Sequence, residues 1–501
     1  MERSVRITRN ALLNVVAFLY PAALAIVITP VVLHFVGTAA YGIYALSVAF
    51  ISILGLLEFG AGIALLKYLP EHIVNGDEDA VNEVMQSGVA LYGLLALTGA
   101  VISFAVAPFS PDLFDVSGSL SGESQRAFVI GGVGFALTVL ANVFGSALGA
   151  LQRFDITTGI TLIATTVATA TTVVLLVLGA GLDGLMVGIA LQPAVDLVLS
   201  ARSVKKRLPY VRFTPKWHPE NVRRLATLSA YVLIGNVSGL VLFQFDKFYL
   251  GVINGATAVA FYVVPGALAS RLHSAASSLT SVSLPAASEL FAQGDFDRAR
   301  TLYRRATWLT TLILASIAVP AMLFSEPLLH YWVGGDFPDK STTVLQILIA
   351  TYLLLSMSAI PYWFAMASGH LRSTGVFNGA TAVINVVAIL ILVPRHGLIG
   401  AAVAYLVSMV TVPCFVWYAE RRVLQLQRTP WLAIGWRLGI GVAVQVAVCL
   451  ALRGLAHDLA ATVGLVLVCI AVAPAVLFAL RLIEVEDRML LSRVLHRQGS
   501  A

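Results

Sequence analysis

The sequence predicts an all-helical integral membrane protein with about fourteen transmembrane helices, and three observations lead to this fold class. The 501-residue chain is 58% hydrophobic and only 12% charged, whereas a soluble domain carries about 25% charged residues. Its apolar runs approach the roughly 20 residues that a helix needs to cross ~30 Å of hydrocarbon. Lys and Arg residues are concentrated in every second connecting loop, as the topology of a membrane protein requires.

Helices are expected rather than a β-barrel, because barrel strands are about half as long and alternate apolar with polar residues. Polar or glycine-rich turns separate the runs, as at Gly179–Gly181 and Asn254–Gly255. The predicted spans are 11–34, 41–66, 87–108, 127–149, 156–179, 184–203, 225–250, 256–284, 306–326, 343–366, 374–394, 398–419, 434–452 and 459–480.

The basic residues predict the orientation. If the N-terminus is cytoplasmic, the cytoplasmic segments hold 26 Lys and Arg residues and the opposite segments hold 4, which is a strong positive-inside bias. Both termini are then cytoplasmic, and the net charge of +6 reflects topology rather than nucleic-acid binding. The apolar run that follows the first ten residues is too long for a signal peptide. The N-terminal segment with Arg3, Arg6 and Arg9 is therefore predicted to form a short amphipathic lead-in that lies on anionic lipid.

An internal repeat relates the two halves of the chain. The matching pairs, most of them at an offset of 218, are Gly37 and Gly255, Tyr44 and Tyr262, Glu71 and Glu289, Gly76-Asp77 and Gly294-Asp295, and Gly181 and Gly397. The repeating unit has six helices, so both copies insert with the same orientation. The predicted organisation is an N-terminal lobe over 1–204, a basic cytoplasmic linker over 205–224, a C-terminal lobe over 225–420, and two further helices with a cytoplasmic tail over 421–501. Such proteins usually bind substrate between the lobes.

No sequence motif indicates an enzyme. There is no P-loop, no HExxH and no paired metal-ligand motif, and Cys414, Cys449 and Cys469 fall in apolar runs as small core residues. No cofactor is therefore expected. A transporter of this kind takes its energy from an H⁺ or Na⁺ gradient, the membrane potential or the substrate gradient.

Apart from Arg202 and Arg437, which lie at cytoplasmic span ends and count with the cytoplasmic segments, two basic residues fall inside predicted spans. Charge is costly there and usually faces a cavity or a partner. Arg271 lies near the middle of the eighth span among small residues. Its guanidinium suits a phosphate anchor, although a structural ion pair with an interior acid is the alternative. Lys247 lies near the outer end of the seventh span, where it either contacts substrate or extends to the interface.

Three acidic residues are candidates for ion coupling. Asp246 precedes Lys247 and is expected either to pair with Arg271 or to bind a coupling cation. Glu58, toward the inner end of the second span, either carries a proton, pairs with Lys67, or lines a wet cavity. Asp196, which follows Pro193 in the sixth span, is the weaker candidate.

The chain resembles the polysaccharide transporter (Wzx-type) family of lipid-linked oligosaccharide flippases, within the multidrug/oligosaccharidyl-lipid/polysaccharide (MOP) exporter superfamily. The resemblance rests on AAYGIYAL and LLEFGAGIALLKYLPE around the second span, GALQRFD after the fourth, FDKFYLG in the seventh, FYVVPG in the eighth, LPAASELFAQGDFDRA, and ASGHLRSTG in the second lobe. These loose motifs cover nearly the whole chain, and their order is what makes the resemblance specific.

The resemblance implies a MATE-like fold in the bacterial inner membrane and export of an undecaprenyl-diphosphate-linked glycan to the periplasmic leaflet. It implies that cationic cavity residues hold the diphosphate and sugar, at positions matching Arg271 and Lys247, with Arg153 at the cytoplasmic mouth. Membrane lipids, a polysaccharide polymerase and a chain-length regulator are the other expected partners, and nucleic acid is not.

Three alternatives stay open. Lipid II flippases share the fourteen-span layout but typically have a more Arg-rich first lobe. Multidrug antiporters share the two lobes with twelve spans. A membrane glycan polymerase or ligase would need a long periplasmic loop, and the longest outer loop here, about 109–126, is short.

Overall fold

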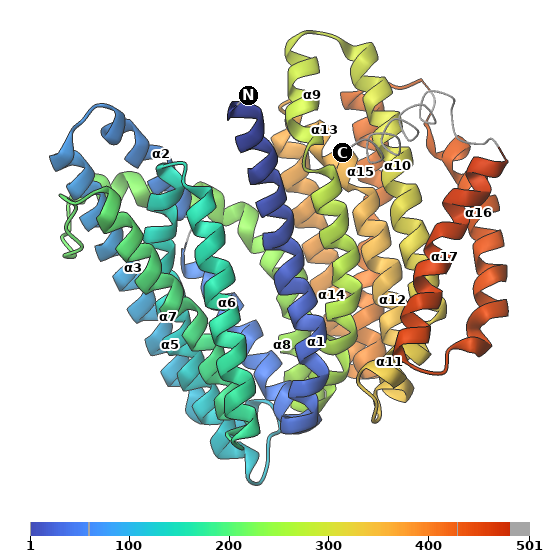
Figure 1. Ribbon diagram of the computed structural model, residues 1–501, viewed down its shortest axis with the longest axis horizontal. Helices are drawn as coiled ribbons and strands as arrows, with labels where there is room; N and C mark the ends of the chain where they lie inside the picture. Colours follow the sequence, from blue (N-terminus) through green and yellow to red (C-terminus); the bar gives the residue numbers. More distant parts are fainter. Residues whose placement is uncertain (1, 59–60, 428, 481–501) are drawn as a thin grey trace. The chain divides into compact units, whose positions relative to one another are not determined.

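The computed structural model describes residues 2–58, 61–427 and 429–480, and within these ranges all regular elements are helices, with no strand (Figure 1). The α-helices are α1 (Glu2–Leu54), α2 (Ala61–Val74), α3 (Glu78–Val106), α4 (Ser110–Leu113), α5 (Leu120–Ala150), α6 (Phe154–Val177), α7 (Gly181–Arg207), α8 (Pro219–Thr280), α9 (Ser283–Ala292), α10 (Phe296–Leu323), α11 (Ser325–Trp332), α12 (Phe337–Met357), α13 (Ala359–Ala367), α14 (Leu371–Ser408), α15 (Thr411–Tyr418), α16 (Trp431–Leu452) and α17 (Leu459–Ala479). A 3₁₀ turn at Gly55–Glu58 and a π-helical turn at Ala419–Val423 interrupt this series.

Eleven helical segments in the described ranges are long and apolar enough to cross a membrane. Three of them each contain two predicted spans, because α1, α8 and α14 continue through a corner at Gly37, Gly255 and Gly397 respectively. The predicted fourteen helices are thus confirmed once these corners are counted as span boundaries. The predicted lead-in at Arg3, Arg6 and Arg9 belongs to α1, but these side chains lie outside those that the structure describes, as does the tail from 481 onward.

The glycine corners confirm the internal repeat. Gly37 has φ 76° and ψ 169°, and its counterpart Gly255 has φ 77° and ψ 168°. Positive φ is readily available only to glycine, so each corner is fixed by its residue type. The repeat extends to helix starts, because Asp77 accepts a hydrogen bond from the Ala80 amide and Asp295 accepts one from the Arg298 amide at matching N-caps.

One predicted span is wrong in its continuity. The stretch 41–66 is not a single helix, because α1 ends at Leu54 and the Gly55–Glu58 turn follows before α2 begins at Ala61. The sequence here, GLLEFGAG, is rich in glycine, and each glycine costs roughly 1 kcal/mol in a helix interior. Glu58 therefore lies on a tight turn rather than on the face of a transmembrane helix.

The chain divides into two compact units. The first comprises Met1–Val264 with Ile389–Ala401, and the second comprises Pro265–Ala388 with Ala402–Ala501. These units are defined by which residues pack together, whereas the predicted lobes are defined by the sequence repeat. The lobe and linker boundaries at 1–204, 205–224, 225–420 and 421–501 stay a prediction.

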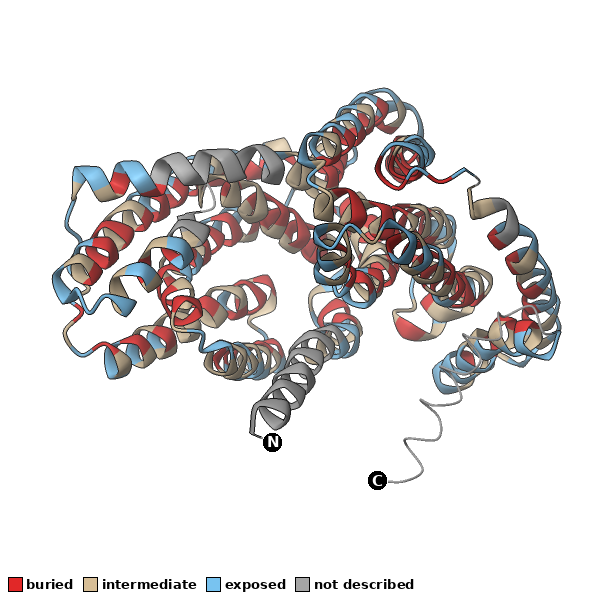
Figure 2. Cartoon of the chain, turned by 90° about the horizontal axis from the view of Figure 1, so that it is seen from above, coloured by how far each residue is buried: buried red, intermediate tan, exposed pale blue. Residues whose placement is uncertain are grey.

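Small residues allow close helix packing in the first unit. A β-carbon at Gly188 of α7 would lie 1.8 Å from the Thr172 hydroxyl oxygen of α6, and one at Gly42 of α1 would lie 1.9 Å from the Ala256 carbonyl oxygen of α8. Such close approach is typical of membrane helix interfaces, where van der Waals contact replaces the hydrophobic effect. The buried residues accordingly gather on the helix sides that face other helices (Figure 2).

A buried glutamine joins the last two helices to α10 within the second unit. The Gln445 side-chain amide of α16 donates hydrogen bonds to the Ser316 carbonyl of α10 (2.8 Å) and the Cys469 carbonyl of α17 (2.9 Å). Gln445 is fully buried, so these bonds form where water does not compete. They fix α16 and α17 against α10.

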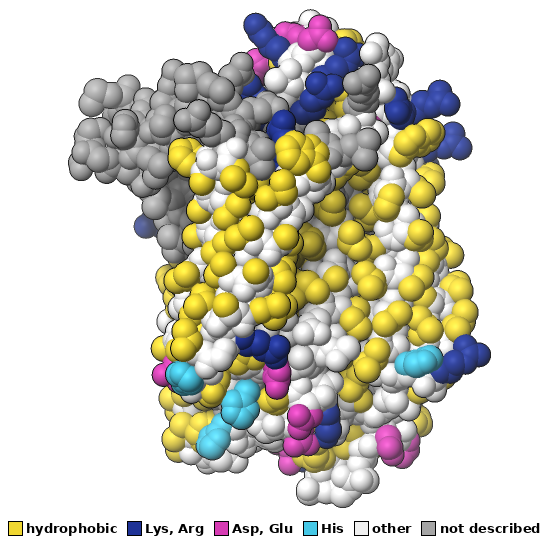
Figure 3. Space-filling model, turned by 90° about the vertical axis from the view of Figure 1, so that its right-hand side faces the viewer, with side chains coloured by type: hydrophobic (Ala, Val, Ile, Leu, Met, Phe, Trp, Pro, Cys, Tyr) yellow, Lys and Arg dark blue, Asp and Glu magenta, His cyan; other side chains and the backbone are white. Residues whose placement is uncertain are grey.

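The outer surface is suited to lipid. Large apolar side chains are widely exposed, including Leu97 (62%), Val177 (64%) and Leu467 (62%). Figure 3 shows one face with hydrophobic side chains along its middle and charged side chains gathered toward its ends. An apolar belt of this kind is what the hydrocarbon core of a bilayer requires.

Candidate functional site

A buried acid lies beside the Gly255 corner of α8. Asp246 is 3% exposed, and its Oδ2 accepts a 2.6 Å hydrogen bond from the hydroxyl group of Tyr262, on the other side of the corner. Its Oδ1 accepts a 2.8 Å bond from the Lys247 amide. The corner reverses the chain and so brings the two residues together within the first unit. The two predicted roles of Asp246, pairing with Arg271 and binding a coupling cation, stay predictions.

The Lys247 side chain turns back onto its own helix. Its ammonium donates to the Phe243 carbonyl (2.7 Å) and to Gln244 Oε1 (3.0 Å), and the side chain is half-buried. An ammonium has three N–H donors, so one is left over for a further partner. The predicted extension to the interface is therefore not the arrangement that the structure has.

Arg271 lies in the second unit, on the later part of α8, and it is half-buried. Its Nε is fully buried, and no described residue accepts a hydrogen bond or ion pair from the guanidinium. The neighbouring hydroxyl groups of Ser270 and Ser274 bond to backbone carbonyls of their own helix. A buried N–H donor of a cationic group is costly when no described residue accepts from it, so this guanidinium is suited to an anionic ligand.

Glu58 is held by an amide. Both of its carboxylate oxygens accept from the Asn142 side-chain nitrogen of α5, at 3.0 and 3.1 Å. Lys67, the predicted alternative partner, instead has its ammonium 5.3 Å from the centroid of the Tyr68 ring. Within the described residues, Glu58 thus has a neutral partner and no basic one, which leaves its charge to be balanced by a proton or a bound cation.

Arg153 and Asp196 complete the predicted set. Arg153, at the start of α6, is exposed and forms a two-pronged pair with Asp155 at 2.9 and 3.0 Å. These hydrogen bonds raise the pKa of Arg153 and occupy the prongs that a phosphate would use. Asp196 is half-buried on α7 and bonds to no residue in the described ranges. The structure brings Asp246, Lys247 and Tyr262 together but joins neither Arg153 nor Asp196 to them.

The charged residues of the seventh and eighth predicted spans have no charged counterparts in the first repeat. At the offset of 218, Asp246, Lys247 and Arg271 match Ile28, Thr29 and Ile53. The glycine corners of the two copies have nearly equal torsion angles, but charged side chains lie near the corner in only one of them. This asymmetry indicates that the charges are not required by the repeat fold itself.

Three partner residues in these contacts were not predicted from the sequence. Tyr262 appeared only as the repeat counterpart of Tyr44, and Asn142 gave no signal because it lies 84 positions from Glu58. Glu420, fully buried where α15 ends, accepts a 3.0 Å hydrogen bond from Tyr303 of α10. The predicted span 398–419 ends one residue before Glu420, so span position gives no signal for it.

Known proteins give three likenesses. The sequence profile of the family described as "Polysaccharide biosynthesis protein" matches residues 7–291. A Shigella flexneri protein named "Putative O-antigen transporter" is 20% identical over 406 residues, which cover 81% of this chain and 95% of that protein. The Bacillus subtilis (strain 168) "Uncharacterized membrane protein EpsK" is 23% identical over 411 residues and 81% of each chain.

Solved structures share the fold. The lipid II flippase MurJ in an inward closed conformation superposes with a TM-score of 0.68 at 14% identity, covering 94% of this chain and 99% of that one. An inward-facing MATE multidrug transporter of the MOP superfamily has a TM-score of 0.66 at 15% identity, covering 83% and 96%. The MOP-type fold is confirmed, and, since the profile covers more than half of the sequence, the chain belongs to the polysaccharide biosynthesis protein family.

Proposed function

We propose that this protein is a secondary transporter that flips undecaprenyl-diphosphate-linked oligosaccharides from the cytoplasmic to the periplasmic leaflet of the bacterial inner membrane. Membership of the polysaccharide biosynthesis family and the likeness to a protein named for O-antigen transport support the substrate class. The positive-inside bias supports cytoplasmic termini. A glycan polymerase and a chain-length regulator would act on the exported repeat units.

The single observation that carries the proposal is Arg271. Its guanidinium is half-buried in a membrane segment, and no described side chain or carbonyl accepts from it. A diphosphate offers the planar, charge-assisted contacts that a guanidinium satisfies best. Arg271 would bind the substrate's anionic headgroup. Lys247, which lies in the first unit, is a separate candidate contact for the substrate through its remaining N–H.

Glu58 is the stronger candidate for coupling to an H⁺ or Na⁺ gradient. Its described partner is a neutral amide, so gain or loss of a proton changes the net charge of that site. Asp246, with a tyrosine hydroxyl group and a backbone amide as partners, is the second candidate. Transport that continues unchanged after both gradients are collapsed would exclude ion coupling for either residue.

Complementation tests the proposal. A strain that lacks its own O-antigen flippase should regain surface glycan with the wild-type protein, lose it with Arg271→Ala, and keep part of it with Arg271→Lys. Arg395→Ala, which removes an exposed arginine just beyond the predicted span 374–394, is the matched control and should retain export. Full export by Arg271→Ala at equal expression would remove Arg271 from the mechanism. Rescue of a strain that lacks its lipid II flippase, without rescue of the first, would overturn the substrate class.

A further inference from the structure

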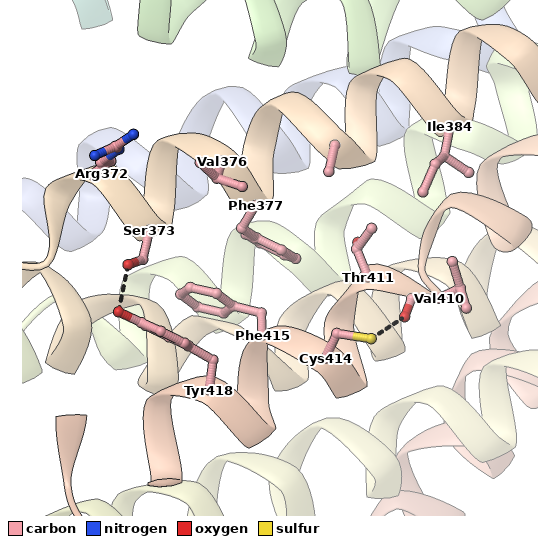
Figure 4. A pocket seen from close by; sticks show the side chains of 11 residues that line it. Arg372, Ser373, Val376, Phe377, Ile384, Val410, Thr411, Cys414, Phe415 and Tyr418 are labelled. Carbon is pink, nitrogen blue, oxygen red and sulfur yellow. Dashed lines mark hydrogen bonds between the residues drawn. The ribbon is translucent and has the colours of Figure 1, made fainter. Parts of the chain in front are cut away.

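An open groove runs between α14 and α15 in the second unit (Figure 4). Its volume is about 490 Å³. Side chains between Arg372 and Ile384 of α14 and between Val410 and Tyr418 line it. None of the residues assigned to substrate binding or ion coupling above is among them, so the groove is a separate feature of the molecule.

The middle of the groove offers no polar group to a ligand. Phe377 and Phe415 stack with ring centroids 4.4 Å apart and form much of its wall. The Thr411 hydroxyl group is shared with Thr381 at 2.7 Å, and the Cys414 thiol points to the Val410 carbonyl. Because these polar groups already have partners on the protein, the groove favours an apolar occupant.

One end of the groove is polar and basic. Ser373 donates a 2.7 Å hydrogen bond to the Tyr418 hydroxyl oxygen, which joins the two helices there (Figure 4). Arg372 lies beside them, is exposed, and has no partner among the described residues. No acidic residue lines the groove. The charge at this end is complementary to a phosphate group.

We propose that the groove binds one acyl chain of an anionic phospholipid, with the lipid phosphate against Arg372. A methylene group is similar in size to a water molecule, which occupies roughly 30 Å³ of liquid, so 490 Å³ holds about sixteen such groups. This is the length of one acyl chain and well short of a whole polyprenyl tail. Basic pockets between membrane helices on the cytoplasmic side are typical sites for anionic lipid headgroups.

The cysteines provide a direct probe of occupancy. Cys414 lines the groove and is exposed, whereas Cys449 and Cys469 are fully buried. In nanodiscs of the full-length protein, N-ethylmaleimide should modify Cys414 about fivefold more slowly when phosphatidylglycerol replaces phosphatidylcholine of the same chain length. Arg372→Gln should remove this lipid dependence. Arg422→Gln, which removes a neighbouring exposed charge that does not line the groove, should keep it.

Native mass spectrometry gives an independent reading. The wild-type protein and the Arg422→Gln variant should each retain one phosphatidylglycerol that Arg372→Gln and Ala380→Trp lose, since the tryptophan fills the groove. Val383→Trp, on an exposed position of the same helix outside the groove, should retain it. Equal retention by all variants, or preferential retention of a polyprenyl phosphate when both lipids are present at equal concentration, would overturn the proposal. Neither measurement depends on transport, so the result is independent of the proposed flippase activity.

Discussion

The hydroxyl group of Tyr262 donates a 2.6 Å hydrogen bond to the carboxylate of Asp246 across the Gly255 corner of α8. Both residues are buried, at 2% and 3% exposure. The bond connects two predicted spans and satisfies a carboxylate oxygen within the membrane, where no water replaces a lost donor. This hydrogen bond therefore stabilises the corner and also positions Asp246, a candidate coupling residue.

Tyr262→Phe should destabilise the protein, because Asp246 Oδ2 loses its donor while packing is preserved. We expect a loss of about 1–2 kcal/mol in the free energy of unfolding, measured by denaturant titration of the purified protein in detergent. The matched control is Tyr44→Phe at the same position of the first repeat, where Ile28 replaces the acid. A similar loss in both variants would show that the hydroxyl–carboxylate bond is not the cause.

The Tyr303–Glu420 pair should be replaceable by the residues of the other repeat. At the repeat offsets of 218 and 216, these positions match Met85 and Val204, both fully buried. Tyr303→Phe alone should cost about 1–3 kcal/mol, because it removes the donor to a buried carboxylate. The double variant Tyr303→Met with Glu420→Val should recover most of that loss, since an apolar pair needs no hydrogen bond. The measurement is the unfolding midpoint of the wild type, the single variant and the double variant. A double variant that is less stable than the single variant would contradict the prediction.

Gln445→Leu should loosen α16 and α17 from α10, because two hydrogen bonds to carbonyls of different helices disappear. We expect Cys449 and Cys469 to become reactive toward a small thiol reagent, in addition to the exposed Cys414. Mass spectrometry of the intact protein counts the modified thiols. Gln346→Leu removes comparable bonds to Met322 and Ser325 elsewhere in the second unit and should leave one thiol reactive. Equal labelling in the two variants would argue against a specific role for Gln445.

Gly188→Ala should overpack the contact between α6 and α7. Its new methyl group would lie 1.8 Å from the Thr172 hydroxyl oxygen, and such overpacking costs typically about 1–3 kcal/mol. Adding Thr172→Ala should restore much of the stability. Gly145→Ala on α5 meets no atom within 4 Å and is the control for the substitution itself. Thermal unfolding of the four proteins is the measurement, and no rescue by Thr172→Ala would place the cause elsewhere.

Glu58→Gln should uncouple glycan export from the ion gradient if Glu58 carries the coupling charge. Glutamine keeps the shape and can still bond to Asn142, but it cannot lose a proton. Export measured in cells with and without an uncoupler should lose its gradient dependence in this variant. Glu83→Gln, at an exposed acid that also contacts an asparagine, Asn221, should keep it. Unchanged gradient dependence in Glu58→Gln would exclude this residue.

The sequence by itself determined the helices, their corners and the repeat. Apolar length, glycine position and basic-residue counts are properties of short stretches of chain, and the bilayer imposes the same requirement on each span. Gly37 and Gly255 could be paired from letters alone, and their torsion angles agree within 1°. Continuity through 41–66 failed because several glycines there compete with helix formation, which hydropathy alone does not register.

The tertiary structure decided which polar groups meet. Glu58 and Asn142 are 84 positions apart, and Tyr303 and Glu420 are 117 apart, so each pairing depends on helix packing and rotation. The predicted alternative of a Glu58–Lys67 pair also depended on helix packing, and in the structure the Lys67 ammonium lies over the Tyr68 ring instead. A charged residue in a span predicts a partner, because its desolvation is costly. Only the packing of the helices determines which side chain is that partner.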